Sequence, residues 1–166
     1  MLGLQLLRLA PVMLTSAAVH FDYSQYLFLK PFTQLPADLG GDRKGVDATL
    51  KHYLLCQFPS GLTSILLLYP LTWAMAAANL FVGRAALSLS ARRLYAVGLV
   101  FNVSHMLWAP HALDLMETMS GQRPNKRSDE EDNIDLLNKW LRMHTTRSLL
   151  VDVPGWLCFT AAFLLR

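Results

Sequence analysis

Residues 58–82 read FPSGLTSILLLYPLTWAMAAANLFV, and this stretch decides the fold that we expect. Between Leu62 and Leu80 it contains no charged side chain. It is long enough to supply the about 20 apolar residues with which an α-helix crosses a bilayer. Pro70 lies inside the stretch and is expected to bend the helix. The stretch therefore predicts a transmembrane helix.

Three more apolar blocks have similar lengths, at residues 4–29, 94–119 and 147–165. Hydrophobic residues make up 53% of the chain and charged residues only 16%, whereas about 25% of the residues of a typical soluble domain are charged. A chain of 166 residues has the length of one domain. We therefore predict an all-α fold, a four-helix transmembrane bundle that forms a single integral membrane domain over residues 1–166. We expect it in the endoplasmic reticulum or another endomembrane.

The segments between the blocks are polar and rich in residues that favour turns. Residues 30–52 contain several prolines and glycines and are expected to form an irregular loop, and residues 121–133 are expected to form a charged, solvated loop. Residues 134–147 then show the spacing of an amphipathic helix, with Asp132 or Asn133 as its N-cap. This pattern predicts an amphipathic interfacial helix that leads into the fourth span.

Charge and motif content argue against several classes of function. The net charge is +3, but the basic residues are scattered between apolar blocks, so we expect lipid headgroups and no nucleic acid as partners. Cys56 and Cys158 lack the spacing of a disulfide framework or a thiolate metal site. No two histidines are four residues apart, no Glu-x-x-His motif occurs, and no glycine-rich phosphate loop is present. We therefore expect no metal and no cofactor.

Residues 140–147 read WLRMHTTR and place three unusual side chains at the start of the fourth span. Trp140, His144 and Arg147 are spaced at i, i+4 and i+7, so they lie along one face of a helix. Polar groups near membrane depth are costly and usually functional, which makes these residues site candidates. The alternative is an interfacial anchor, with the indole among the headgroups and the guanidinium extended to a phosphate.

Polar residues also interrupt the first and third spans. The first span ends in a polar group of site candidates, which are His20, Asp22, Tyr23 and Tyr26. The third span carries candidates at every third position, which are Asn102, His105, Trp108, His111 and Asp114. A three-residue period drifts around an α-helix by about 60° per step, so only neighbours meet, such as the imidazole–carboxylate pair His111 and Asp114. The alternatives are an interfacial belt for the first group and structural histidines for the second.

The segment LLNKWLRMHTTRSLL, residues 136–150, resembles the C-terminal motif of the anthrone oxygenase-like family of small fungal integral membrane proteins. That motif has a Trp, then an Asn or His four positions after it and an Arg seven positions after it, before the last span. The layout of the spans is also similar over most of the chain. The third span departs from the family pattern at residues 110–112, which read Pro-His-Ala, and at Ser120, so the anthrone substrate does not carry over directly.

The resemblance implies a tailoring enzyme that acts on a hydrophobic small molecule, a lipophilic aromatic or polyketide intermediate. Members of the family oxidise an anthrone to an anthraquinone with dioxygen, or have no assigned role. An anthrone is a weak carbon acid whose enolate reacts directly with dioxygen, so the protein needs a base, a cation and a dry pocket. The same parts suit a cofactor-free acid/base cyclase, an epoxide-opening enzyme or an isomerase. A non-catalytic membrane scaffold is the remaining alternative.

In such a mechanism, His144 or His105 is the candidate base and Arg147 the anion-stabilising cation. The further acid–base candidates are Asp22, His111 and Asp114. The side chains expected to contact substrate are Trp140, Trp108, Tyr23, Tyr26, His20 and Asn102. We expect His144 and Arg147 to point into the bundle, opposite residues 20–26 and 102–111. We also expect Arg147→Ala to abolish turnover without disturbing membrane insertion, and His52→Ala, in the loop, to have little effect.

Overall fold

The computed structural model describes residues 2–35, 41–82, 85, 87–123 and 132–165, and all the regular elements among them are helical. The prediction of an all-α, four-helix fold is confirmed. The elements are α1 (Leu2–Leu29), the 3₁₀ turn η1 (Lys30–Thr33), α3 (Arg43–Phe81), α4 (Leu89–Ser104), the 3₁₀ segment η3 (His105–Trp108), α5 (Ala109–Met119), α6 (Asn133–Arg147), the π-helical segment η4 (Ser148–Asp152) and α7 (Val153–Leu164).

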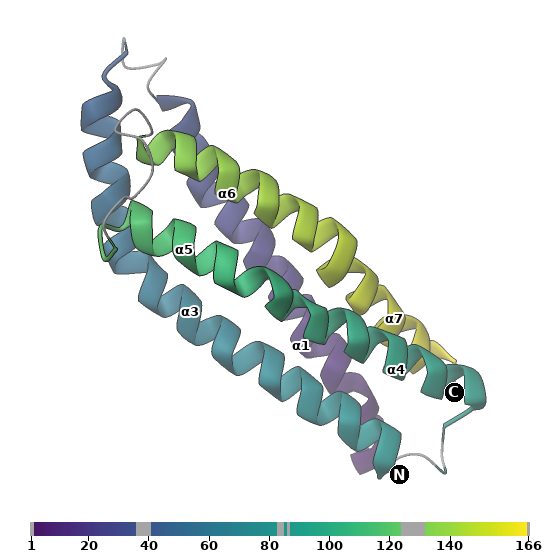
Figure 1. The fold of residues 1–166 in the computed structure, drawn as a ribbon. Coiled ribbons are helices and arrows are strands. Elements are labelled where there is room, and N and C mark those ends of the chain that lie inside the picture. Colours follow the sequence, from purple (N-terminus) through teal and green to yellow (C-terminus); the bar gives the residue numbers. More distant parts are fainter. Residues whose placement is uncertain (1, 36–40, 83–84, 86, 124–131, 166) are drawn as a thin grey trace.

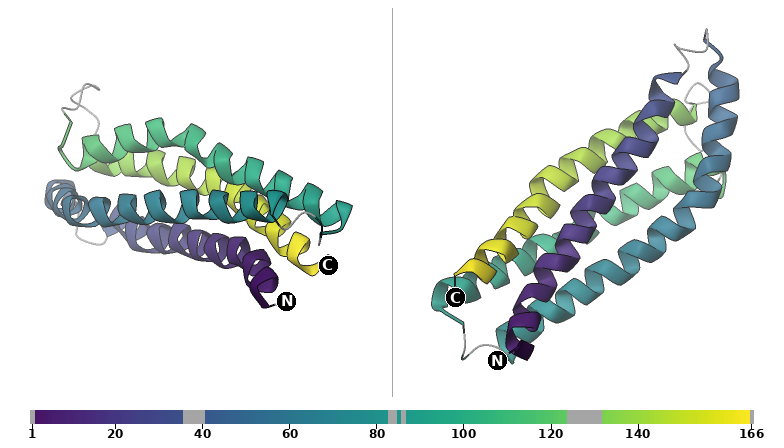
Figure 2. Two further views of the ribbon diagram at one scale, coloured as in Figure 1. Left: turned by 90° about the horizontal axis from the view of Figure 1, so that it is seen from below. Right: turned by 180° about the vertical axis from the view of Figure 1, so that it is seen from behind.

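These elements form four long rods that run up and down beside one another (Figure 1). α1 and α3 are the first two rods, α4 continues through η3 into α5 as the third, and α6 continues through η4 into α7 as the fourth. The N-terminus and the C-terminus lie at the same end of the bundle in each view (Figure 2). The connections therefore give the up-down-up-down order that short loops favour.

The second rod is longer than its apolar block, because α3 begins at Arg43 rather than near residue 58. Val46, Leu50 and Leu54 are buried at intervals of four, which gives this extension an apolar face against the core. The predicted loop over residues 30–52 is therefore partly helical, while residues 36–40 lie outside the described part of the chain. His52, expected in that loop, is an exposed helical residue.

The third rod is interrupted where the sequence predicts a continuous span. Pro110 has no N–H for the carbonyl of Met106, and its ring crowds that carbonyl, so the chain tightens into the 3₁₀ segment η3 just before it. Among the described residues, three helical stretches are long and apolar enough to cross a membrane: Leu2–Thr33, Arg43–Phe81 and Asn133–Leu164.

The fourth rod includes the helix that the sequence places at the membrane interface. Asp132 is its N-cap and accepts a hydrogen bond from the Asp135 N–H at 3.0 Å, as the sequence predicts. The Arg43 guanidinium, 2.7 Å from Asp132, holds the pKa of that carboxyl below its ordinary value. From there α6 runs without a break into the last span, and half of its residues pack into the bundle. Most of the predicted 121–133 loop lies outside the described residues.

The outer surface of the bundle carries many large apolar side chains. Leu66, Leu67, Val100, Leu149 and Leu150 are each more than 60% exposed and come from three of the four rods. A soluble monomer rarely exposes so much apolar surface, whereas a bilayer provides it with an apolar environment. The outer surface therefore fits a protein that spans a membrane.

The third and fourth rods approach closely at Gly98 of α4. A Cβ atom at this position would lie 3.0 Å from Phe159 and 3.2 Å from Cys158, both on α7. We expect Gly98→Val to lower the free energy of unfolding by about 1–3 kcal/mol, because the added atoms overpack the contact. Thermal unfolding in detergent micelles, followed by tryptophan fluorescence, measures the loss. Gly3→Val is the matched control, since a Cβ there meets nothing within 4 Å, and an equal loss in both variants would contradict the expectation.

Candidate functional site

A cluster of buried charged groups lies where α1 and the fourth rod meet in the interior of the bundle. Arg147, at the end of α6, is only 4% exposed. Its Nη2 atom lies 2.9 Å from Oδ1 of Asp22 on α1, and its Nε atom lies 3.2 Å from Oδ2 of Asp152 in η4. Both carboxylates are as buried as the arginine. A single guanidinium thus binds two carboxylates from different rods.

The π-helical segment makes this arrangement possible. Arg147 and Asp152 are five residues apart, which on an α-helix places them about 140° apart around the axis. In η4 the Val153 N–H bonds to the Ser148 carbonyl, five residues back, and this wider turn brings the two side chains to the same side. Pro154, which lacks the N–H needed to continue the α-helical pattern, follows directly.

The Asp152 carboxylate organises a second part of the cluster. Besides Arg147, it accepts hydrogen bonds from the Tyr69 hydroxyl at 3.0 Å and from Nδ1 of His105 at 2.8 Å. The Tyr69 and His105 rings also pack together, with 3.9 Å between their centroids. Because Nδ1 of His105 donates to the carboxylate, its proton is on Nδ1 and its Nε2 atom keeps a free lone pair. Nε2 makes no hydrogen bond to the described residues.

His144 uses both of its ring nitrogens inside the cluster. Nε2 donates to the backbone carbonyl of Asp22 at 2.9 Å, so Nδ1 accepts from Arg147 Nη2, also at 2.9 Å. The imidazole stacks on Trp140 with 4.4 Å between the ring centroids. The Ser148 hydroxyl donates to Oδ2 of Asp22 at 2.9 Å. His144 therefore holds the cluster together and leaves no lone pair for a substrate.

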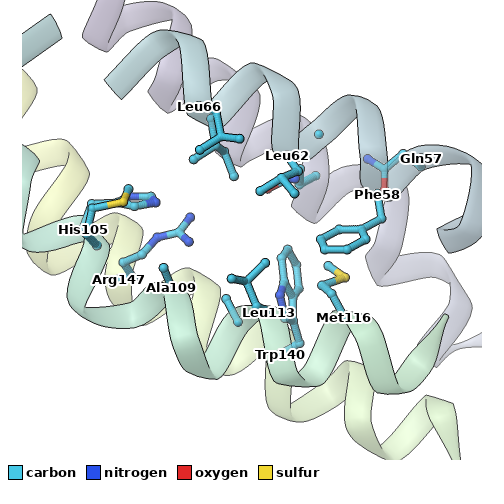
Figure 3. A pocket seen from close by; sticks show the side chains of 15 residues that line it. Gln57, Phe58, Leu62, Leu66, His105, Ala109, Leu113, Met116, Trp140 and Arg147 are labelled. Carbon is cyan, nitrogen blue, oxygen red and sulfur yellow. The ribbon is translucent and has the colours of Figure 1, made fainter. Parts of the chain in front are cut away.

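An apolar cavity adjoins this cluster (Figure 3). It has a volume of about 140 Å³. The Arg147 guanidinium and the His105 ring lie at one end, and Gln57 and Phe58 lie at the other. The walls between them are apolar and include Leu62, Ile65, Leu66, Ala109, Leu113, Met116 and Trp140.

The electrostatics of the cavity follow from the groups at its polar end. The Asp152 carboxylate lies 2.8 Å from Nδ1 of His105, so it would stabilise the imidazolium that forms when Nε2 accepts a proton. The Nη1 atom of Arg147 makes no hydrogen bond to the described residues, so it is available to an anion in the cavity. The site thus presents an oriented base and a cation to an apolar space.

The described residues contain no group of three or more His, Cys, Asp or Glu side chains placed to hold a metal ion.

The chain's relatives are found among fungal proteins. It is 30% identical over 164 residues to the epoxidase pydX of an Acremonium species, which covers 98% of this chain and 95% of pydX.

The chain belongs to the pydX family. Other members are a Mollisia scopiformis protein named "Probable epoxidase scpX", 29% identical over 97% of this chain and 96% of its own length, and the "Oxaleimides biosynthesis cluster protein N" of Penicillium oxalicum, 29% identical over 93% and 86%. No protein-family model and no solved structure matches the chain. These names support an enzymatic tailoring role in fungal secondary metabolism, and the anthrone oxygenase-like resemblance stays a prediction.

In this member of the pydX family, five of the predicted site residues come together. The charged and aromatic side chains that meet in the cluster or line the cavity are Asp22, His105, Trp140, His144 and Arg147, each 4% exposed or less. They face one another in the interior, whereas the side chains of an interfacial anchor would point outward to the lipid headgroups. The expectation that His144 and Arg147 point into the bundle agrees with this geometry.

The other predicted site residues lie elsewhere. Tyr23 and Tyr26 line an outer groove that reaches Asp22 and His144 from the side away from the cavity, and His20 is exposed beside it. Trp108 and His111 line a surface groove between α5 and α6. The remaining two are Asp114, which pairs with Arg123 at 3.0 Å, and Asn102, which is buried but does not line the cavity.

Four residues of the site were not among the sequence-based candidates. Asp152 and Ser148 belong to the π-helical segment, whose register ordinary helical spacing does not reveal. Tyr69 is the single tyrosine of the apolar block at residues 58–82, next to Pro70, and this isolated hydroxyl could have identified it as a candidate. Gln25 shares a helical face with Asp22, three residues earlier, and this spacing would have been enough to include it.

Proposed function

We propose that this protein is a membrane-embedded tailoring enzyme that removes a proton from a lipophilic aromatic or polyketide intermediate and directs the resulting anion to oxygenation. One observation carries the proposal. The free Nε2 lone pair of His105, oriented by Asp152, and the Arg147 guanidinium both border the same apolar cavity. A base and a cation in a dry space are the groups that a carbon acid requires.

The reaction follows from the charges of these groups. Nε2 of His105 accepts the proton from the acidic carbon, and the Asp152 carboxylate on Nδ1 stabilises the resulting imidazolium. The electron pair moves onto the carbonyl oxygen of the substrate, where Arg147 stabilises the enolate. The apolar walls exclude water and strengthen this interaction. For an anthrone, the carbanion then reacts with dioxygen, and one oxygen atom enters the anthraquinone while the other leaves as water.

Epoxide formation is the second candidate reaction, and the names of pydX and scpX favour it. The two candidates differ in their electron balance. An anthrone supplies both electrons that reduce the second oxygen atom, whereas epoxidation of an isolated alkene by dioxygen requires a separate two-electron donor. A requirement for added reductant therefore distinguishes them.

The test uses membranes that contain the protein, with anthrone as the probe. Without dioxygen and in deuterated buffer, we expect exchange of deuterium into the methylene group of anthrone, which reports proton removal alone. With ¹⁸O₂ and no reductant, we expect one labelled oxygen in anthraquinone. Rates equal to those of membranes without the protein would contradict the carbon-acid proposal. Single-oxygen labelling of an alkene probe such as farnesol, only with NADPH, would favour epoxidation.

A further inference from the structure

Gln25 on α1 is a polar side chain that the acid–base mechanism does not use. It is 7% exposed and lines the apolar cavity. Its amide makes no hydrogen bond to any described residue, whereas the carboxylate of Asp22, on the same helix, is bonded within the cluster. The amide is open to the cavity and adds no hydrogen bond to the fold, so a side chain that served only the packing here could equally be apolar.

The position of this amide is defined from the opposite rod. A Cβ atom built on Gly61 of α3 would lie 3.5 Å from Nε2 of Gln25. Gly61 also lines the cavity, so the absence of a side chain there leaves the amide accessible. Gln25 lies three residues after Asp22, about 4.5 Å further along the helix axis. The amide is therefore about one helical turn away from the charged cluster.

A second unpartnered polar atom belongs to the same wall. Nε1 of Trp140 is buried without a hydrogen-bond partner among the described residues, and the indole points into the cavity (Figure 3). Gln57 adds another amide at the far end. The Gln25 and Gln57 amides thus lie along an apolar space whose charges are confined to one end. This arrangement suits a ligand with a neutral oxygen function remote from the reacting atom.

We propose that Gln25 is a substrate-recognition residue whose amide binds a hydroxyl oxygen of the lipophilic substrate, about one helical turn from the acid–base centre. This rests on the proposed function only in taking the cavity as the substrate site. The substrate class is then a lipophilic molecule with a second, neutral oxygen function, and a plain hydrocarbon skeleton binds more weakly.

Binding of two inert ligands of matched shape tests this. 2-Hydroxyanthraquinone and 2-methylanthraquinone differ only in a hydroxyl or methyl group, and neither is an anthrone that dioxygen can oxidise. Equilibrium binding to the full chain in detergent micelles is expected to favour the hydroxyl compound by about tenfold, the effect of one ordinary hydrogen bond. Gln25→Leu should remove this preference. Gln5→Leu, exposed on the same helix, should keep it.

Two further measurements separate recognition from a structural role. Gly61→Ala keeps the amide but places a methyl group beside it, and it should reduce the preference without loss of stability, since Ala is the better helix former. Gln25→Leu should not lower the unfolding temperature, because the amide makes no hydrogen bond to any described residue. Equal affinities of the wild type for both ligands, no binding of either, or a lower unfolding temperature of Gln25→Leu would overturn the proposal. A preference that the wild type shows and Gln25→Leu lacks, together with no turnover of anthrone by the wild type, would reject the proposed function alone.

Discussion

Replacing His105 with Gln is expected to lower the rates of deuterium exchange and of oxygenation by about 10²–10⁴-fold, the usual contribution of a general base. The substitution removes the Nε2 lone pair that borders the cavity. A glutamine amide can still donate to Asp152, which keeps its other partners, the Tyr69 hydroxyl and Arg147. The protein should therefore fold, and the loss should appear in catalysis rather than in thermal unfolding.

Two other histidines provide controls for this experiment. His111→Gln changes a side chain of the surface groove, and His52→Gln changes an exposed residue of α3. Both variants should retain the wild-type rate at equal protein levels. If anaerobic deuterium exchange in His105→Gln proceeds at the wild-type rate, His105 is not the base. His144 offers no alternative lone pair, because both of its nitrogens are bonded.

The fold was predictable because long apolar segments of the sequence indicate helices that avoid water. The four apolar blocks correspond to the four rods, and the charged N-cap Asp132 marks the start of the last one. Two boundaries were not predictable in this way. The first turns of α3 are helical because Leu50 and Leu54 pack in the core. The glycines and prolines nearby had instead suggested a loop. Pro110 changes the type of helix at η3, which hydropathy does not register.

The site was predictable where it lies on one regular helix. Trp140, His144 and Arg147 follow α-helical spacing, and their convergence needed only that period. Asp22 and His105 were candidates because polar groups at membrane depth need partners, although the sequence does not say which partners. Asp152 depends on a π turn, and so the second carboxylate on Arg147 became visible only in the structure.

The second large effect concerns stability, and it revises the expectation that Arg147→Ala leaves the protein intact. Arg147 holds two buried carboxylates, so its removal leaves both uncompensated. We expect Arg147→Met to lower the free energy of unfolding by about 3–5 kcal/mol, the usual cost of breaking a buried ion pair on one side. Thermal unfolding in detergent micelles measures this. Arg142→Met, exposed on the same helix, is the control and should lose little.

A double variant separates the electrostatic cause from lost packing. Arg147→Met with Asp22→Asn removes one of the two carboxyl groups that Arg147→Met leaves without a guanidinium partner, so it should recover much of the stability. It should not recover deuterium exchange or oxygenation, because no guanidinium then borders the cavity to stabilise the enolate. Equal unfolding temperatures for Arg147→Met and Arg142→Met would instead place Arg147 at the membrane surface as an anchor. Restored turnover in the double variant would show that the reaction does not depend on this cation.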